Sequence, residues 1–253
     1  MHLFEFCDQS WVPRSARECL YEIMEFCNSG CRKYNQWMAD SAWEIARREG
    51  LDTIVELGAG RAPITTLLGE DESSAAVTLV PCDLVPDEQV FRDLAARYPD
   101  RVKPIYKPVD ISNPELPFQR TLLILPGVLH HIPFASRGDV VAALSRPGRY
   151  VVVVESQRRT WFSILFTLTA IFPTLALPLA YLRRGGRLRR FLWCWLLPIV
   201  PPMFLWDGVV SCLRQWSVGQ WHEEMDRLKD VVDNVEIRAG RHWLRAVWSG
   251  RSK

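Results

Sequence analysis

The stretch Thr53-Ile-Val-Glu-Leu-Gly-Ala-Gly-Arg-Ala-Pro63 decides the fold of this chain. It begins with an apolar pair, Ile54-Val55, which predicts a buried strand. Glu56 follows, and then Gly58 and Gly60, which let the backbone turn sharply away from a strand and leave room for a ligand against it. An acid before such a turn can accept hydrogen bonds from N–H groups of a ligand or of the loop. Because a lone Gly-x-Gly also fits an ordinary strand-to-helix turn, the rest of the chain must decide.

Composition sets the broad class. The chain has 253 residues, 48% of them hydrophobic, which fits one large domain or a domain with an insertion. The formal net charge of +2 gives no global attraction to nucleic acid, and no nucleic-acid partner is expected. The seven cysteines are odd in number and include no Cys-x-x-Cys pair. We therefore expect no metal site, and free thiols in a reducing, cytoplasmic compartment.

Residues 51–154 alternate between strand and helix patterns. The expected strands are nearly all apolar and comprise Thr53–Leu57, Ala76–Val80, Val102–Tyr106, Thr121–Leu125 and Tyr150–Val154. Such a series implies a parallel sheet that is covered by helices on both faces. Asn234–Ala239 and His242–Trp248 predict an antiparallel hairpin that completes the sheet. The predicted fold class is therefore α/β: a doubly wound, mostly parallel, seven-stranded, Rossmann-like sheet with N-terminal helices and a hydrophobic helical insertion before the last strands.

Acids stand at the ends of successive expected strands. Asp83 follows the second strand, where a carboxylate can take both hydroxyls of a ribose in a doubly wound sheet. Asp110 follows the third strand and can hold the amino group of an adenine, while Ile111 covers the adenine face. Each acid alone is more typical of a helix cap or a solvated surface. Their occurrence in order at strand ends favours a ligand site.

The series formed by Val55 to Gly60, Asp83, Val109 to Ile111 and Leu125 to Pro133 resembles the motif series of class I S-adenosylmethionine-dependent methyltransferases of small-molecule type. The resemblance covers residues 35–160 and a tail from residue 207. It implies S-adenosyl-L-methionine as the cofactor. The residues that it assigns to the cofactor are Glu56, Gly58, Ala59, Gly60, Asp83, Leu84, Asp110, Ile111 and Pro126. A dehydrogenase is disfavoured because Pro63 stands where Gly-x-Gly-x-x-Gly requires a third glycine.

The segment from Val128 to Pro133 resembles the loop that lines the methyl-transfer site in many small-molecule members of this family. His130 and His131 are thus the candidate catalytic residues, because an imidazole has a suitable pKa for removing a proton from the acceptor. Adjacent residues on a loop point in different directions, so we expect at most one of them to face the acceptor. We favour His131 slightly, and a purely structural histidine fits each position equally well.

Two further segments resemble a bacterial subgroup of these enzymes. One is the N-terminal opening, which contains Trp11 and Arg14, and the other is the run Asp207, Ser211 and Arg214. The resemblance implies substrate binding by Trp11, Arg14 and Arg214. For the second run, a helix cap and a salt bridge on a helix are the alternative explanation.

Residues 161–206 form a hydrophobic insertion. Trp161 to Leu182 is uncharged and meets the length that spans a bilayer, ~20 residues. A spanning hairpin is disfavoured, because it would place the arginines that follow on the far side of the membrane. Two interpretations stay open: a monotopic insertion into one leaflet, and a soluble lid over an apolar substrate pocket. In the first, anionic lipid would contact Arg183, Arg184, Arg187, Arg189 and Arg190.

The predicted organisation is an N-terminal helical cap over residues 1–50, a methyltransferase core over 51–160 and 207–253, and the insertion over 161–206. We expect methyl transfer to a small hydrophobic or lipid-like acceptor by a cytoplasmic protein, either soluble or attached as a peripheral or monotopic protein to the inner face of the membrane. The alternative function is that of a non-catalytic, membrane-associated binding protein with the same fold. The acceptor atom and the oligomeric state are left open.

Overall fold

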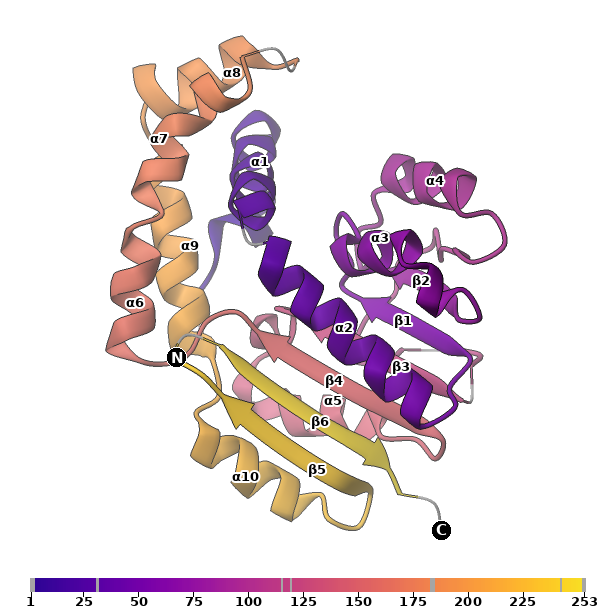
Figure 1. The fold of residues 1–253 in the computed structure, drawn as a ribbon. Coiled ribbons are helices and arrows are strands. Elements are labelled where there is room, and N and C mark those ends of the chain that lie inside the picture. Colours follow the sequence, from indigo (N-terminus) through magenta and orange to yellow (C-terminus); the bar gives the residue numbers. More distant parts are fainter. Residues whose placement is uncertain are drawn as a thin grey trace. The chain divides into compact units, whose positions relative to one another are not determined.

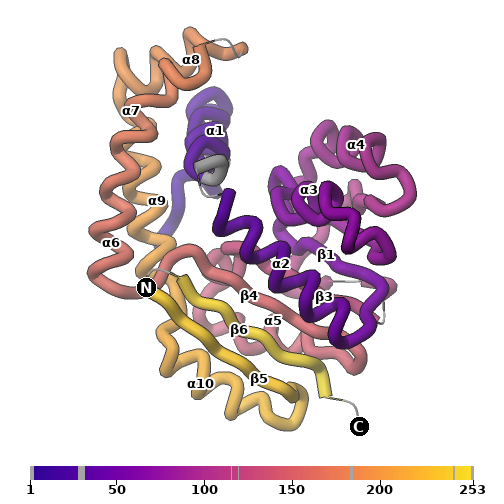
Figure 2. Tube along the Cα trace, in the orientation of Figure 1, coloured from indigo at the N-terminus to yellow at the C-terminus, as the bar shows by residue number. Residues whose placement is uncertain are grey.

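The computed structural model describes residues 3–30, 32–114, 116–118, 120–182, 185–241 and 243–251, with the backbone alone at 28–30. The chain divides into two compact units. The sheet unit comprises residues 33–156 and 216–253, and the helical unit comprises residues 1–32 and 157–215. The chain therefore enters each unit twice, as the colours along the trace in Figure 2 show. The predicted cap over residues 1–50 is shared between the two units, and the predicted domain boundaries stay a prediction.

The sheet unit contains six strands within the described residues, in the order β2-β1-β3-β4-β6-β5 (Figure 1). Strands β1 to β4 are parallel, β6 is antiparallel to β4, and β5 is antiparallel to β6. The strands are β1 (Thr53–Leu57), β2 (Thr78–Cys82), β3 (Thr121–Pro126), β4 (Arg149–Glu155), β5 (Val232–Ala239) and β6 (Leu244–Gly250). The predicted mostly parallel sheet and its terminal hairpin are confirmed, although position 242 lies outside the described residues.

Helices cover both faces of this sheet because successive strand residues point to opposite sides. Ile54, Leu122 and Ile124 pack with α2, α3 and α4 on one face. Val55 and Leu123 pack with α5 and α10 on the other face. The helices of the sheet unit are α2 (Arg32–Arg48), α3 (Pro63–Glu70), α4 (Glu88–Arg97), α5 (Arg137–Leu144) and α10 (Val218–Arg227). The alternation explains why the strands are apolar throughout.

The prediction of a strand at Val102–Tyr106 is wrong. The prediction of seven strands is therefore wrong as well, since the described residues form six. The segment lies beside β2 in parallel, where Lys103 N–H donates to the carbonyl of Leu79 and Ile105 N–H donates to that of Pro81. Pro81 lacks an N–H group and cannot return the bond that would continue the ladder. A single parallel bridge, between Leu79 and Val102, therefore remains.

The helical unit packs α6, α7 and α1 around α9. Its helices are α1 (Arg14–Gly30), α6 (Trp161–Leu168), α7 (Ile171–Ala180), α8 (Arg187–Phe191), a π-helical segment (Leu192–Leu196) and α9 (Val200–Arg214). The core of the unit includes Leu20 and Ile23 from α1, Leu177 from α7 and Val200 from α9. The predicted boundary at 206 therefore falls inside a helix, because α9 continues through Asp207 to Arg214.

Within the described residues, Trp161–Ala180 is the one stretch that is long and apolar enough to cross a membrane by itself, and 28% of its 18-residue apolar window is buried. The segments Arg187–Leu196 and Val200–Arg214 together have the composition of a broken span or a re-entrant loop and are bent by 79°. Pro198 lies at this bend, and two prolines occupy the first turn of α9, where they need no hydrogen-bond donor.

Two arginines of the predicted lipid-facing run act inside the helical unit. Arg190 is fully buried, and its guanidinium lies 3.1 Å from Glu22 and donates to the carbonyl of Tyr181 at 2.8 Å. Arg189 pairs with Glu18 and, at 2.7 Å, with Glu22. Buried Arg190 is therefore inaccessible to lipid, whereas lipid contact by the half-buried, paired Arg189 stays a prediction. Positions 183 and 184 lie outside the described residues.

Candidate cofactor and methyl-transfer site

The turn after β1 is fixed from below by Glu56. Its carboxylate is buried and accepts hydrogen bonds from the N–H of Ile64 at 3.2 Å and from the N–H and hydroxyl of Thr65 at 2.8 and 2.7 Å. An acid is favourable there because the first N–H groups of α3 lack helical partners. Burial raises the pKa of the Glu56 carboxyl to about 7, although these hydrogen bonds oppose the rise. Glu56 therefore bonds to the loop, and a contact with the cofactor stays a prediction.

The two glycines of the turn have different roles. Gly58 has φ +70°, and a Cβ there would lie 2.5 Å from Cγ2 of Val128, so the loop after β3 packs directly against it. Gly60 has φ +53°, and no atom lies within 4 Å of the place of its missing Cβ. Ala59 between them is buried, and its N–H donates to the carbonyl of Cys82. Gly58 thus permits packing, while Gly60 borders open space.

Asp83 joins the turn after β1 to the turn after β2. Its Oδ2 accepts the N–H of Gly60 at 2.8 Å, and its Oδ1 accepts the N–H of Val85 at 2.8 Å. Leu84 and Val85 are 58% and 79% exposed. Because each carboxylate oxygen has a further lone pair, Asp83 can still accept two hydroxyl donors. Apolar side chains that are this exposed and lie beside an acid can cover the flat face of an adenine.

The predicted adenine residues lie on the segment that follows the bridge to β2. Val109 N–H donates to the carbonyl of Asp83 at 2.8 Å, which brings Asp110 close to the end of β2. Asp110 is exposed, and its Oδ1 accepts the N–H of Ser112 at 2.8 Å. Ile111, however, is 8% exposed and packs in the core, so little of its surface is left for an adenine face.

The end of β3 provides a second open position. Pro126 ends the strand, and Gly127 follows with φ +65° and no atom within 4 Å of its missing Cβ. The N–H of Gly127 donates to the carbonyl of Val154 at 2.7 Å, which ties this end to β4. Since β1 and β3 are neighbours in the sheet, Gly60 and Gly127 leave open space at adjacent carboxyl ends.

The two candidate histidines form one short 3-10 turn, Leu129–His131. His130 is buried, and its Nδ1 lies 2.9 Å from Oε2 of Glu155, which is buried as well. The His131 ring is half-buried, and its centroid lies 4.3 Å from that of His130. Glu155 is the last residue of β4, and its carboxylate can orient the imidazole ring of His130.

Arg137 stabilises the turn that carries the two histidines by donating hydrogen bonds to its backbone carbonyls. It is 1% exposed, and its guanidinium donates to the carbonyls of His130 at 2.9 Å and Ile132 at 2.8 Å. Its Cζ also lies 4.3 Å from the ring centroid of Phe134. Neither Arg137 nor Glu155 was among the residues predicted from the sequence. The signal for Glu155 was an acid that directly follows four valines, whereas nothing in the sequence sets Arg137 apart.

The three predicted substrate residues belong to the helical unit. Arg214 is buried, and its Nη1 lies 3.0 Å from Oε1 of Glu5. Ser211 donates to the same oxygen at 3.1 Å, and Asp207 accepts the N–H groups of Phe6 at 2.6 Å and Cys7 at 3.0 Å. The run on α9 thus binds the N-terminal segment, and substrate binding by Arg214 stays a prediction.

The other two predicted substrate residues are on the surface of that unit. Arg14 pairs with Glu18 at 3.0 Å. Trp11 is 65% exposed and makes edge-to-face contacts with Phe4 and Phe6. Substrate binding by these residues stays a prediction.

Comparison with solved structures identifies the fold. The plantazolicin methyltransferase BpumL, solved in complex with SAH, superposes on this chain with a TM-score of 0.62 at 9% sequence identity. The superposition covers 97% of this chain and 94% of the BpumL chain. The methyltransferase domain of a bacterial CtHen1 superposes with a TM-score of 0.51 over 85% of this chain and 98% of its own, at 10% identity. No protein-family model and no curated protein sequence matches the chain.

At these identities the likeness establishes the fold. The chain has the fold of class I S-adenosylmethionine-dependent methyltransferases, as its motif series predicted. Its chemistry has to be argued from its own residues.

Proposed function

We propose that this protein is an S-adenosylmethionine-dependent methyltransferase that acts on a small hydrophobic molecule. The observation that carries the proposal is the open space beside Gly60 and Gly127, with Asp83 next to it. These residues follow β1, β3 and β2, which are adjacent in the sheet. Ligands of open α/β sheets bind at such carboxyl ends. When bound, the cofactor supplies a methyl group on a positively charged sulfur. The acceptor atom forms a bond to the methyl carbon, and the sulfur leaves as a neutral thioether.

The residues around this space fit the parts of the cofactor. Gly60 offers backbone without a side chain, against which a ligand can lie closely. Asp83 accepts the ribose hydroxyls through the lone pairs that its bonds to Gly60 and Val85 leave, and Asp110 accepts the adenine amino group. Leu84 covers the adenine ring of the cofactor with its exposed side chain, and buried Ile111 is less suited to this role. Glu56 acts indirectly, by fixing α3 under the turn.

The best-placed base is His130. A carboxylate at Nδ1 makes that nitrogen the donor, so Nε2 carries the lone pair that can take a proton from the acceptor. Arg137 stabilises the same turn by bonding its carbonyls. His131, which the sequence slightly favoured, is the alternative, and single substitutions separate the two. This assignment supports acceptors that carry a proton on the reacting atom.

The acceptor class and the membrane association are inferred from the helical unit. Its helices expose large apolar side chains that are each more than half accessible, and the most exposed are Trp161, Phe166, Phe172, Leu179, Leu188 and Leu196. We call these side chains the apolar surface. Exposed apolar side chains that gather on neighbouring helices are typical of an interaction surface. Since 28% of the 18-residue apolar window in Trp161–Ala180 is buried, the stretch differs from the mostly buried core helix of a soluble protein.

Of the two open interpretations, the apolar surface favours monotopic attachment to one leaflet and not a soluble lid. With Arg189 and Arg190 paired to Glu18 and Glu22, apolar insertion must supply most of the binding energy. We therefore expect flotation with neutral phosphatidylcholine vesicles. Phe172→Ser should weaken it, whereas Val231→Ser, an exposed apolar position of the sheet unit, should not. A protein that stays wholly in the aqueous fraction with every vesicle would contradict membrane attachment.

Activity is tested by incubating the protein with methyl-labelled cofactor and a lipophilic cell extract. We expect label in an apolar product, identified by mass spectrometry, and no label with Asp83→Asn. If the protein floats with vesicles but neither binds the cofactor nor labels any product, the methyltransferase proposal fails and the non-catalytic, membrane-associated binding protein replaces it.

A further inference from the structure

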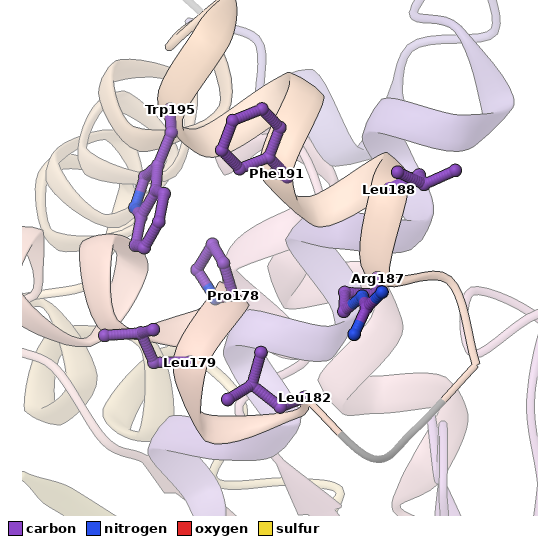
Figure 3. A pocket seen from close by; sticks show the side chains of 7 residues that line it. All are labelled: Pro178, Leu179, Leu182, Arg187, Leu188, Phe191 and Trp195. Atoms are coloured by element: carbon purple, nitrogen blue, oxygen red, sulfur yellow. The ribbon is translucent and has the colours of Figure 1, made fainter.

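A pocket of 310 Å³ lies within the helical unit, between α7 and α8. Figure 3 shows its lining side chains, which come from the end of α7, the turn after it, α8 and the π-helical segment. Six of them are apolar or aromatic: Pro178, Leu179, Leu182, Leu188, Phe191 and Trp195. The seventh is Arg187, whose nitrogen atoms lie beside these carbon side chains in Figure 3. The volume is at the lower end of the range of ligand pockets, ~300–1,000 Å³.

Arg187 differs from the arginines that follow it on α8. Arg189 and Arg190 are held by Glu18 and Glu22, as described above. Arg187 is exposed, and within the described part of the chain no carboxylate lies within ion-pair distance of it. A guanidinium offers a planar fork of donors that matches phosphate or carboxylate oxygens. This cation is therefore available to an anion from outside the chain.

The walls of the pocket suit a hydrocarbon chain. The indole of Trp195 is fixed, since its Nε1 donates to the carbonyl of Leu175 at 3.0 Å and its ring meets Phe191 edge to face at 5.8 Å. Leu179 and Leu188 line the pocket and also belong to the apolar surface, so the pocket is continuous with that surface. A ligand of this pocket must hence combine an apolar chain with an anionic group.

We propose that the pocket binds one anionic amphiphile, with an acyl chain against Pro178, Leu179 and Trp195 and a phosphate on Arg187. The proposal deepens the proposed function, because a membrane to which the helical unit attaches would supply an anionic phospholipid. Among the three described arginines of the run of five that the sequence suggested, it assigns the preference for anionic lipid to Arg187.

The site is tested without a membrane by calorimetric titration with dihexanoyl phosphatidylglycerol below its micelle concentration. We expect saturable binding to the wild type. Arg187→Gln should weaken this binding about tenfold, which corresponds to ~1.4 kcal/mol, because it removes the charge-assisted hydrogen bonds to the phosphate. Arg187→Lys should retain part of the affinity. Lys229→Gln, which removes an exposed cation of the sheet unit, should bind as the wild type does. Arg187 is exposed and unpaired among the described carboxylates, so its variants should fold, and circular dichroism checks this.

Three results would overturn the inference: absence of saturable binding, equal affinity of Arg187→Gln and wild type, and equally tight binding of inorganic phosphate, which would assign the cation to a free anion. Vesicle flotation separates this failure from that of membrane attachment. Equal flotation of wild type and Arg187→Gln with neutral and phosphatidylglycerol vesicles would retain attachment and reject the lipid site. Saturable, Arg187-dependent binding of the monomeric lipid without flotation would retain the site and reject attachment.

Discussion

Nδ1 of His130 lies 2.9 Å from Oε2 of Glu155, and both side chains are buried at the ends of neighbouring strands. A carboxylate in this position fixes the tautomer of the imidazole and stabilises the imidazolium that forms when Nε2 takes a proton. The pair is therefore a candidate for base catalysis, and it gives Glu155 a role that the other residues of β4 lack.

We expect His130→Asn to lower turnover by roughly 10²–10⁴-fold, the usual contribution of a general base, without loss of cofactor affinity. Glu155→Gln should lower turnover less, because its amide can still bond the ring but lacks the charge that stabilises the imidazolium. His222→Asn, at an exposed position of α10, serves as the control. If His131→Asn abolishes turnover while His130→Asn retains it, the assignment of the base is reversed.

The two glycines of the first turn should respond differently to alanine. Gly58→Ala places a Cβ 2.5 Å from Val128 on a left-handed backbone. We expect a loss of stability of roughly 2–4 kcal/mol from strain and overpacking together. Gly60→Ala meets open space, so it should cost less stability and mainly weaken cofactor binding. Denaturant titration and calorimetry distinguish the two effects, and equal losses of stability would show that the space beside Gly60 is not open.

The pair of Arg214 and Glu5 should be a major support of the helical unit. Arg214→Met leaves a buried carboxylate without its cation, so we expect a loss of roughly 3–5 kcal/mol in thermal or denaturant unfolding. Glu5→Gln in the same chain should restore part of it. Arg14→Gln, at an exposed ion pair, should have almost no effect. An Arg214→Met protein as stable as the wild type would contradict this role.

Folding stability should depend on pH through two buried acids. Burial raises the pKa of Glu56 from 4.5 to about 7 and that of Asp207 from 3.8 to about 6. A carboxyl that holds its proton more tightly when folded contributes stability that is full below its unfolded pKa and is lost as the pH rises through its folded pKa. The decline that comes from Glu56 extends to higher pH than the decline that comes from Asp207. Glu56→Gln should therefore flatten the unfolding temperature between pH 6 and 7, and an unchanged slope would contradict the shift.

The sheet could be predicted from the sequence because its strands are apolar runs bounded by turn residues, and the acids at their ends mark the edge that can bind a ligand. Val102–Tyr106 could not be predicted correctly, because the missing ladder bond depends on Pro81 in the neighbouring strand. Glu155 and Arg137 act through contacts with His130 that only the folded chain brings together. The composition changes at Asp207, but α9 continues because Asp207, Ser211 and Arg214 share one helix face.

The most direct test of the account is calorimetric titration of the wild-type protein and of Asp83→Asn with S-adenosylmethionine and with its demethylated product. We expect saturable binding of both ligands to the wild type at one site per chain. Binding should be much weaker to Asp83→Asn, which replaces one of the two acceptor oxygens, now bonded to Gly60 and Val85, with an NH₂ donor. Lack of binding of either ligand by a folded wild-type protein would contradict the proposed methyltransferase function.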